Sequence, residues 1–211
     1  MKKSFISVLT LFCLFSCTRH YIPKTGDIVF QDLDCGALCD AIEKVTSGID
    51  NKDFSHVGIV SVENDTAFVY EAIGPGVIRT PFTRFIARSV DSLNNPKVLV
   101  GRIHSNIQYT IPGAISTCKE LLGRPYDIVF DLKNQSYYCS ELVYEAFRDS
   151  SGGRLFDVSP MTFKDPATGN TFPAWIDYYK ELNTGIPEGK PGLNPGGISR
   201  SELIDIVFKY Y

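Results

Sequence analysis

The sequence predicts an α+β protein in which a small antiparallel β-sheet packs against helices. One observation is a series of short segments that are rich in β-branched residues and joined by brief turns, such as 56–62 and 66–73. A second is a pair of longer segments with helical spacing, 112–122 and 136–148, that follow these strands. Strands that succeed one another without a helix between them pair most simply as antiparallel neighbours.

The expected elements follow one another along the chain. They are a strand from the Gly26-Asp27 turn to residue 30, a helix over 33–46, a hairpin of strands 56–62 and 66–73, a strand over 77–80, a helix over 82–89, a strand over 97–103, helices over 112–122 and 136–148, and a closing helix or strand within 199–209. Glu63-Asn64-Asp65 supplies the hairpin turn, because short polar side chains favour such turns. Pro81 stands at a helix start, where its fixed φ is favourable.

The segment 150–197 differs from the rest of the chain. Prolines and glycines recur through it, and it contains the aromatic cluster Trp175-Ile176-Asp177-Tyr178-Tyr179. Irregular segments with many aromatic residues pack over a core more often than they act as linkers. We therefore expect this segment, called the strap below, to be irregular chain fastened onto a single domain that spans 26–211.

The composition excludes several classes of protein. The chain has 211 residues, 21 Lys and Arg against 24 Asp and Glu, 44% hydrophobic residues and 21% charged residues. These proportions are those of an ordinary globular protein rather than a disordered or polytopic membrane protein. A net charge of −3 also argues against a general nucleic-acid binder, which needs a basic face.

Residues 1–16 have the organisation of an export signal. Lys2 and Lys3 precede the mostly apolar run 5–15, which is shorter than the roughly 20 residues that span a bilayer. The run ends in Leu14-Phe15-Ser16-Cys17, which resembles the lipobox of bacterial lipoproteins. The resemblance implies cleavage before Cys17, a diacylglyceryl group on its thiol, a tether over 17–25 and a membrane-anchored location in the cell envelope. The alternative is an ordinary signal peptide in which Cys17 is incidental.

Three of the remaining cysteines are expected to be structural. Cys35, Cys39 and Cys118 are predicted to be small buried side chains. A bridge between Cys35 and Cys39 stays open, although it would close only a short loop and stabilise the protein little. No CxxC pair and no His-rich segment accompanies them, so a zinc site is not expected.

Cys139 lies near the start of the predicted helix 136–148. A helix N-terminus favours negative charge, and therefore favours the thiolate form of a cysteine in its first turn. A neighbouring imidazole favours it further through a thiolate–imidazolium pair. His56, which opens the strand 56–62, is the candidate for that imidazole. Each residue taken alone is more often structural than catalytic.

The motifs around these two residues resemble those of a known superfamily. Leu122-Gly123-Arg124-Pro125-Tyr126 and Tyr138-Cys139-Ser140-Glu141-Leu142-Val143 resemble the nucleophile region of NlpC-type papain-like cysteine hydrolases. Gly26–Phe30, Ser55–Val60 and Val69–Ala72 resemble the sheet region of the same superfamily. The histidine strand precedes the cysteine helix, as in the circularly permuted branch that includes the YiiX-like exported hydrolases and the lecithin:retinol acyltransferase group. The similarity to the YiiX-like proteins covers roughly 26–163.

This resemblance implies a permuted papain-like fold with a barrel-like sheet and an acyl-transfer reaction. Cys139 is the implied nucleophile and His56 its general base. Glu71 takes the place of a third polar residue that orients the imidazole and stabilises its cation, the alternative being a surface position on the hairpin. Tyr126 is implied to assist the Cys139 amide in binding the oxyanion, the alternative being a core tyrosine. The reaction requires no metal and no organic cofactor.

Several functions are compatible with these features. The leading hypothesis is an envelope amidase or endopeptidase that acts on small peptides or peptidoglycan fragments. The second is a thioesterase, esterase or acyltransferase that acts on acyl lipids, because other permuted relatives do so. The third is a non-enzymatic envelope binding module, against which the joint presence of Cys139, His56 and Glu71 argues.

Overall fold

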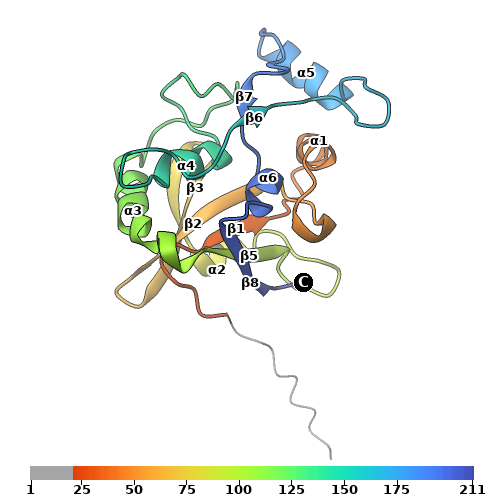
Figure 1. Cartoon of the computed structure of the whole chain (residues 1–211). Helices are drawn as coiled ribbons and strands as arrows, with labels where there is room; N and C mark the ends of the chain where they lie inside the picture. The colour runs from red at the N-terminus through yellow and green to blue at the C-terminus, as the bar shows by residue number, and fades with distance from the viewer. Residues whose placement is uncertain (1–20) are drawn as a thin grey trace, which may run out of the picture.

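The computed structural model describes residues 21–211, which form a six-stranded sheet with helices around it (Figure 1). The signal peptide predicted over 1–16 and the lipidation predicted at Cys17 lie outside the described residues. The strand order is β4-β3-β2-β1-β5-β8, and all neighbours are antiparallel. The strands are β1 (Ile28–Gln31), β2 (His56–Glu63), β3 (Thr66–Ile73), β4 (Gly76–Pro81), β5 (Val98–Ile103) and β8 (Ile204–Lys209).

The α+β class is confirmed, and the strands lie close to their predicted positions. The β2–β3 hairpin turns at Asn64 and Asp65, both of which adopt positive φ angles that these short polar residues tolerate. The closing segment, left open between helix and strand, forms β8 at the edge of the sheet beside β5. Among residues 21–211 no helix is long and apolar enough to cross a membrane.

The helices are mostly short. They are α1 (Ala37–Val45), α2 (Phe82–Ile86), α3 (Ile111–Glu120), α4 (Cys139–Ala146), α5 (Pro173–Glu181) and α6 (Pro195–Ser199). Short 3₁₀ turns occupy Ile49–Asn51 and Ser105–Thr110. The helix predicted over 136–148 is shorter than expected, because Tyr138 is extended at φ −91° and ψ 169°. Cys139 is therefore the first residue of α4.

The two faces of the sheet carry separate hydrophobic clusters. Side chains alternate along a strand, so Val57 and Ile59 of β2 face the larger cluster, whereas Val60 faces the smaller one. Leu142 and Val143 of α4 belong to the larger cluster and are fully buried. This burial fixes α4 against β2, as Figure 1 shows, and so fixes the position of its first residue.

The strap is not irregular throughout, and here the sequence interpretation is wrong. It contains the helix α5 and the short strands β6 (Ser159–Pro160) and β7 (Pro191–Gly192). Pro173 is the first residue of α5, a position where the missing N–H costs nothing. Trp175 and Tyr179, four residues apart, share the buried face of α5 and pack with Ala41 of α1. Figure 1 shows α1 and α5 side by side.

Cys35 and Cys39 form a disulfide, the possibility that the sequence left open, and Cys35 is exposed, so the prediction of a buried side chain there is wrong. Gly36 between them has a φ of 85°, a left-handed conformation that turns the chain into α1. The turn brings the two Cα atoms to 5.4 Å, within the range of a disulfide. Cys118 is buried and free, as is Cys139.

The segment between α3 and α4 is docked on β4 through backbone hydrogen bonds. The N–H of Val77 donates to the carbonyl of Arg124 at 2.8 Å, and the N–H of Gly123 donates to the carbonyl of Val77 at 2.9 Å. Gly76 makes the close approach possible, because a Cβ there would lie 2.1 Å from the Arg124 oxygen. The φ of Gly76 is 141°, which also disfavours any other residue.

We predict that Gly76→Ala lowers the free energy of unfolding by about 2–4 kcal/mol, because the methyl group collides with backbone that cannot move independently. The matched control is Gly74→Ala in the same turn, where φ is 47° but no atom lies within 4 Å of the added Cβ. That control should lose only about 1 kcal/mol of stability from backbone strain. Urea unfolding of both variants checks this, and equal losses would show that the Arg124 contact does not constrain the fold.

Candidate active site

The first turn of α4 presents Cys139 at the end of the sheet. The Cys139 side chain is 5% exposed, and the buried Leu142 and Val143 hold its helix against the core. Glu141, two residues further, accepts a hydrogen bond from the Tyr138 N–H at 3.4 Å and so caps the helix. The amide of Cys139 lies in the first turn, where it has no intrahelical acceptor and remains able to bind an anion.

His56 opens β2 and faces both Cys139 and Glu71. Its Nε2–H donates to Oε2 of Glu71 at 2.6 Å, which leaves Nδ1 as the ring nitrogen that is available to Cys139. Burial lowers the pKa of His56, but the hydrogen bonds with Cys139 and Glu71 and their negative charges outweigh it and raise the pKa to about 9. The imidazole is therefore protonated at neutral pH, as a thiolate–imidazolium pair requires.

Glu71 of β3 is fully buried and is held by three side chains. Beside His56, it accepts from Oγ1 of Thr80 at 2.5 Å and from both Nη atoms of Arg88 at 2.8 and 2.6 Å. Burial raises the pKa of Glu71, but the Arg88 and His56 hydrogen bonds outweigh burial and lower that pKa to about 2. The carboxylate is thus ionised throughout the physiological range and fixes the orientation of the imidazole.

Gly58 lies on the strand that carries the histidine and packs closely against the strand that carries the carboxylate. His56 and Gly58 lie two residues apart on β2 and therefore on the same face, with Glu71 and Val69 on β3 beside them. A Cβ at Gly58 would lie 2.4 Å from Cγ1 of Val69 and 3.5 Å from Cβ of Glu71. The missing side chain leaves the space that the Val69 side chain occupies.

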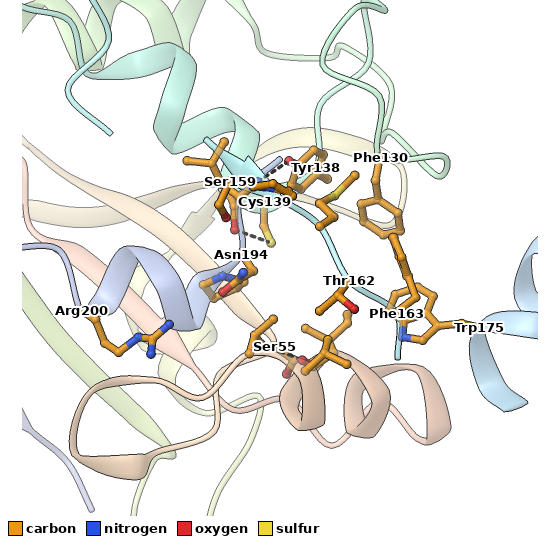
Figure 2. A pocket seen from close by; sticks show the side chains of 18 of the residues that line it. Ser55, Phe130, Tyr138, Cys139, Ser159, Thr162, Phe163, Trp175, Asn194 and Arg200 are labelled. Carbon is orange, nitrogen blue, oxygen red and sulfur yellow. Dashed lines mark hydrogen bonds between the residues drawn. The ribbon is translucent and has the colours of Figure 1, made fainter. Parts of the chain in front are cut away.

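Cys139 opens into a cavity of about 240 Å³ (Figure 2). One wall is formed by Ile42 and Val45 of α1 and by Thr46, which follows this helix. The strap forms most of another wall, with residues 159–163, Trp175 and 193–195. Among the described residues that line the cavity, Arg200 alone carries a formal charge, and Figure 2 shows it on the side away from Phe130, Phe163 and Trp175.

Tyr126 lines the same cavity as Cys139 and belongs to the segment docked on β4. Its backbone forms a parallel bridge with Tyr137, just before α4. Burial, followed by the negative charge of Cys139, raises the pKa of Tyr126 well above its usual value. A neutral phenol can donate a hydrogen bond to an oxyanion, and the role implied for Tyr126 stays a prediction.

The structure thus brings together the three residues predicted from sequence, Cys139, His56 and Glu71, and adds two that sequence reasoning missed. Arg88 follows α2 and Thr80 belongs to β4, and both act on Glu71. Neither lies in a motif, and only the folding of α2 over the sheet brings Arg88 to the carboxylate. The other described histidine, His104, is half-exposed beside Asp205 and distant from this group in the fold.

Residues 22–207 match the model of a protein family described as "Permuted papain-like amidase enzyme, YaeF/YiiX, C92 family". The chain belongs to this family. The match covers nearly all of the described residues and confirms the permuted papain-like fold that the motif order implied.

Two relatives of this family member come from Escherichia coli. The protein YiiX of strain K12 is 32% identical over 134 residues, which are 63% of this chain and 61% of that protein. The crystal structure of yiiX from strain O157:H7 is 25% identical, has a TM-score of 0.72 and covers 90% of this chain and 98% of its own. The latter is described as a metalloprotein. Within residues 21–211 of the present chain, no three His, Cys, Asp or Glu side chains gather in a group that could hold a metal ion.

We predict that Arg88→Met lowers the free energy of unfolding at pH 7 by about 2–3 kcal/mol, because it leaves a buried carboxylate without its bidentate partner. The Arg88 side chain is 26% exposed, so the loss stays below that of a fully buried pair. Arg84→Met, an exposed neighbour on α2, is the matched control and should change stability by less than about 0.5 kcal/mol. Urea unfolding measures both.

The loss of stability in Arg88→Met should depend on pH. Because the pKa of Glu71 falls from 4.5 to about 2 on folding, its stabilising contribution is complete above pH 4.5 and is lost as the pH falls through 2. The stability difference between wild type and Arg88→Met should therefore be widest above pH 4.5 and shrink toward pH 2. A difference that does not vary with pH would contradict the role of Arg88 as the partner that keeps Glu71 ionised.

Proposed function

We propose that this family member is an exported, lipid-anchored cysteine hydrolase that cleaves an amide bond in peptides derived from the cell wall. The observation that carries the proposal is the buried Cys139–His56–Glu71 arrangement at the wall of a cavity. Membership of an amidase family supports the reaction type. The proposed export and lipid anchor rest on the sequence of residues 1–17, which would place the enzyme near cell-wall peptides.

The first half of the reaction forms an acyl-enzyme. The Cys139 thiolate attacks the substrate carbonyl carbon, and the carbonyl oxygen becomes an oxyanion beside the first-turn amide of α4. The C–N bond then breaks, and the amine leaves with the proton that Nδ1 of His56 donates. Glu71 keeps the ring in the orientation that points this proton at the leaving group.

The second half releases the acyl group. His56, now neutral, accepts a proton from a water molecule, whose oxygen attacks the thioester carbon. The C–S bond breaks, the carboxylic acid leaves and the thiolate–imidazolium pair is restored. Each step uses protein groups and water.

The shape of the cavity supports a small substrate. The strap closes one side of the cavity with residues 159–163, Trp175 and 193–195. A short peptide or peptidoglycan fragment fits such a space better than a folded protein does. The strap is thus proposed to restrict the substrate range of the enzyme.

A specific observation also favours a second candidate, hydrolysis or transfer of an acyl lipid. Phe130, Phe163 and Trp175 form an apolar wall on one side of Cys139 in Figure 2. Such a wall can hold a hydrocarbon chain by excluding water from it. The two candidates share the acyl-enzyme chemistry and differ in the group that the cavity receives.

Incubation of the purified full-length protein with muropeptides and with phospholipid vesicles tests the proposal. We expect new free amino groups from muropeptides and no released fatty acid, because the catalytic arrangement belongs to an amidase family. Cys139→Ala should abolish product formation, whereas Cys118→Ala should retain it, because Cys118 is buried away from the cavity.

Any other outcome of this experiment would contradict part of the proposal. Fatty acid released without amino groups would assign the enzyme to acyl lipids. Equal product from wild type and Cys139→Ala would remove Cys139 from the chemistry. Saturable binding of muropeptides without any product would identify a non-enzymatic binding module.

A further inference from the structure

One buried polar group at the cavity wall has no role in the chemistry described above. The indole N–H of Trp175 is buried, and it donates a hydrogen bond to no acceptor among residues 21–211. The whole side chain is 3% exposed and lines the cavity into which Cys139 opens. An unpaired buried donor is unfavourable, and native proteins keep few of them.

The surroundings of Trp175 are mostly aromatic rings. Phe130, Phe163 and Tyr179 contact its ring, with centroid distances of 6.0, 4.9 and 6.1 Å. Figure 2 shows the indole nitrogen on the side of the ring that faces Thr162 and the cavity. The group therefore combines an apolar lining with a single hydrogen-bond donor, the usual composition of a small-molecule subsite.

Phe130, at this end of the cavity, has a backbone conformation that its surroundings hold in place. Its φ is 57°, a left-handed conformation that is uncommon for a bulky residue. Asp127 imposes it, since its carboxylate accepts hydrogen bonds from the amides of Val129 at 2.9 Å and Asp131 at 2.7 Å. The Tyr178 hydroxyl further holds this loop by donating to the carbonyl of Ile128 at 2.7 Å. Backbone strain that the surroundings enforce is concentrated at functional sites.

We propose that Phe130, Phe163 and Trp175 form the subsite for the acyl side of the substrate, and that Trp175 donates a hydrogen bond to an acceptor oxygen of that group. The ligand class is an uncharged, apolar acyl group that carries a carbonyl oxygen, such as an N-acylated residue with an apolar side chain. A charged group is disfavoured there, because the only charged residue of the described lining, Arg200, lies away from the aromatic side. This assignment rests on the proposed acyl-enzyme reaction of Cys139.

A pair of activated esters separates the donor role of Trp175 from its packing role. N-acetyl-L-phenylalanine p-nitrophenyl ester carries an acetamido carbonyl, whereas the p-nitrophenyl ester of 3-phenylpropanoic acid has the same phenyl group without it. In each case the Cys139 sulfur forms a thioester, the ester C–O bond breaks and p-nitrophenolate leaves with the electron pair. Trp175→Phe keeps an aromatic ring but removes the donor together with part of the indole, and the ester pair separates the two losses because only the N-acetyl ester offers the donor an acetamido acceptor.

We expect Trp175→Phe to lower kcat/KM for the N-acetyl ester by about three- to tenfold, the loss expected for one hydrogen bond. The same variant should leave kcat/KM for the phenylpropanoyl ester within about twofold of wild type. Tyr179→Phe is the matched control, since it removes a hydroxyl from the same aromatic cluster, and it should affect both esters equally. If Trp175→Phe lowers kcat/KM equally for both esters, the donor role is overturned. The N–H would then be assigned a contact with the face of the Phe163 ring instead of a hydrogen bond to the substrate.

A binding measurement keeps this inference separate from the proposed reaction. Trp175 is the one tryptophan of the chain, so intrinsic tryptophan fluorescence reports on this position alone. Titration of the full-length Cys139→Ala protein with N-acetyl-L-phenylalaninamide should give a saturable change in emission. If neither ester acylates the wild type but this change occurs, the proposed reaction fails and the subsite stands. If the esters react and the emission does not change, the subsite fails.

Discussion

The active site depends on the hydrogen bonds that the buried carboxylate of Glu71 accepts. It is fully buried and would destabilise the fold if it were unpaired, so three strands and α2 are arranged to satisfy it. Thr80 and Arg88 supply hydrogen bonds on one side, and His56 supplies one on the other. The same contacts that stabilise the carboxylate therefore orient the imidazole and keep it protonated.

The nucleophile is placed by a second constraint, the packing of a short helix. Leu142 and Val143 bury one face of α4 against the sheet, and the extended backbone of Tyr138 starts the helix at Cys139. The thiol is thereby held near the start of β2, whose first residue is His56. The strap then folds back over this position, and its residues form one side of the cavity into which the helix terminus opens.

The sequence predicts those parts of the site that lie in locally recognisable segments. Cys139 at a helix start, His56 at a strand start and Glu71 on the partner strand follow from patterning and motif order. Arg88, Trp175 and Phe130 do not, because their roles depend on which distant segments pack together and on the backbone conformation of one loop. Likewise, Pro173 in a Pro- and Gly-rich segment obscured the start of α5, and spacing alone did not decide whether Cys35 and Cys39 are bridged.

The central claim is that Cys139 and His56 form a thiolate–imidazolium pair, and the pH dependence of alkylation tests it most directly. Cys118 is the internal reference, since burial raises its pKa to about 12 and should protect it in the folded protein. The account predicts that iodoacetamide modifies Cys139 at pH 6 within about tenfold of its rate at pH 8, and that His56→Ala removes this reactivity at pH 6. A Cys139 rate that falls about tenfold per pH unit below pH 8 in the wild type, as for an ordinary thiol, would contradict the claim.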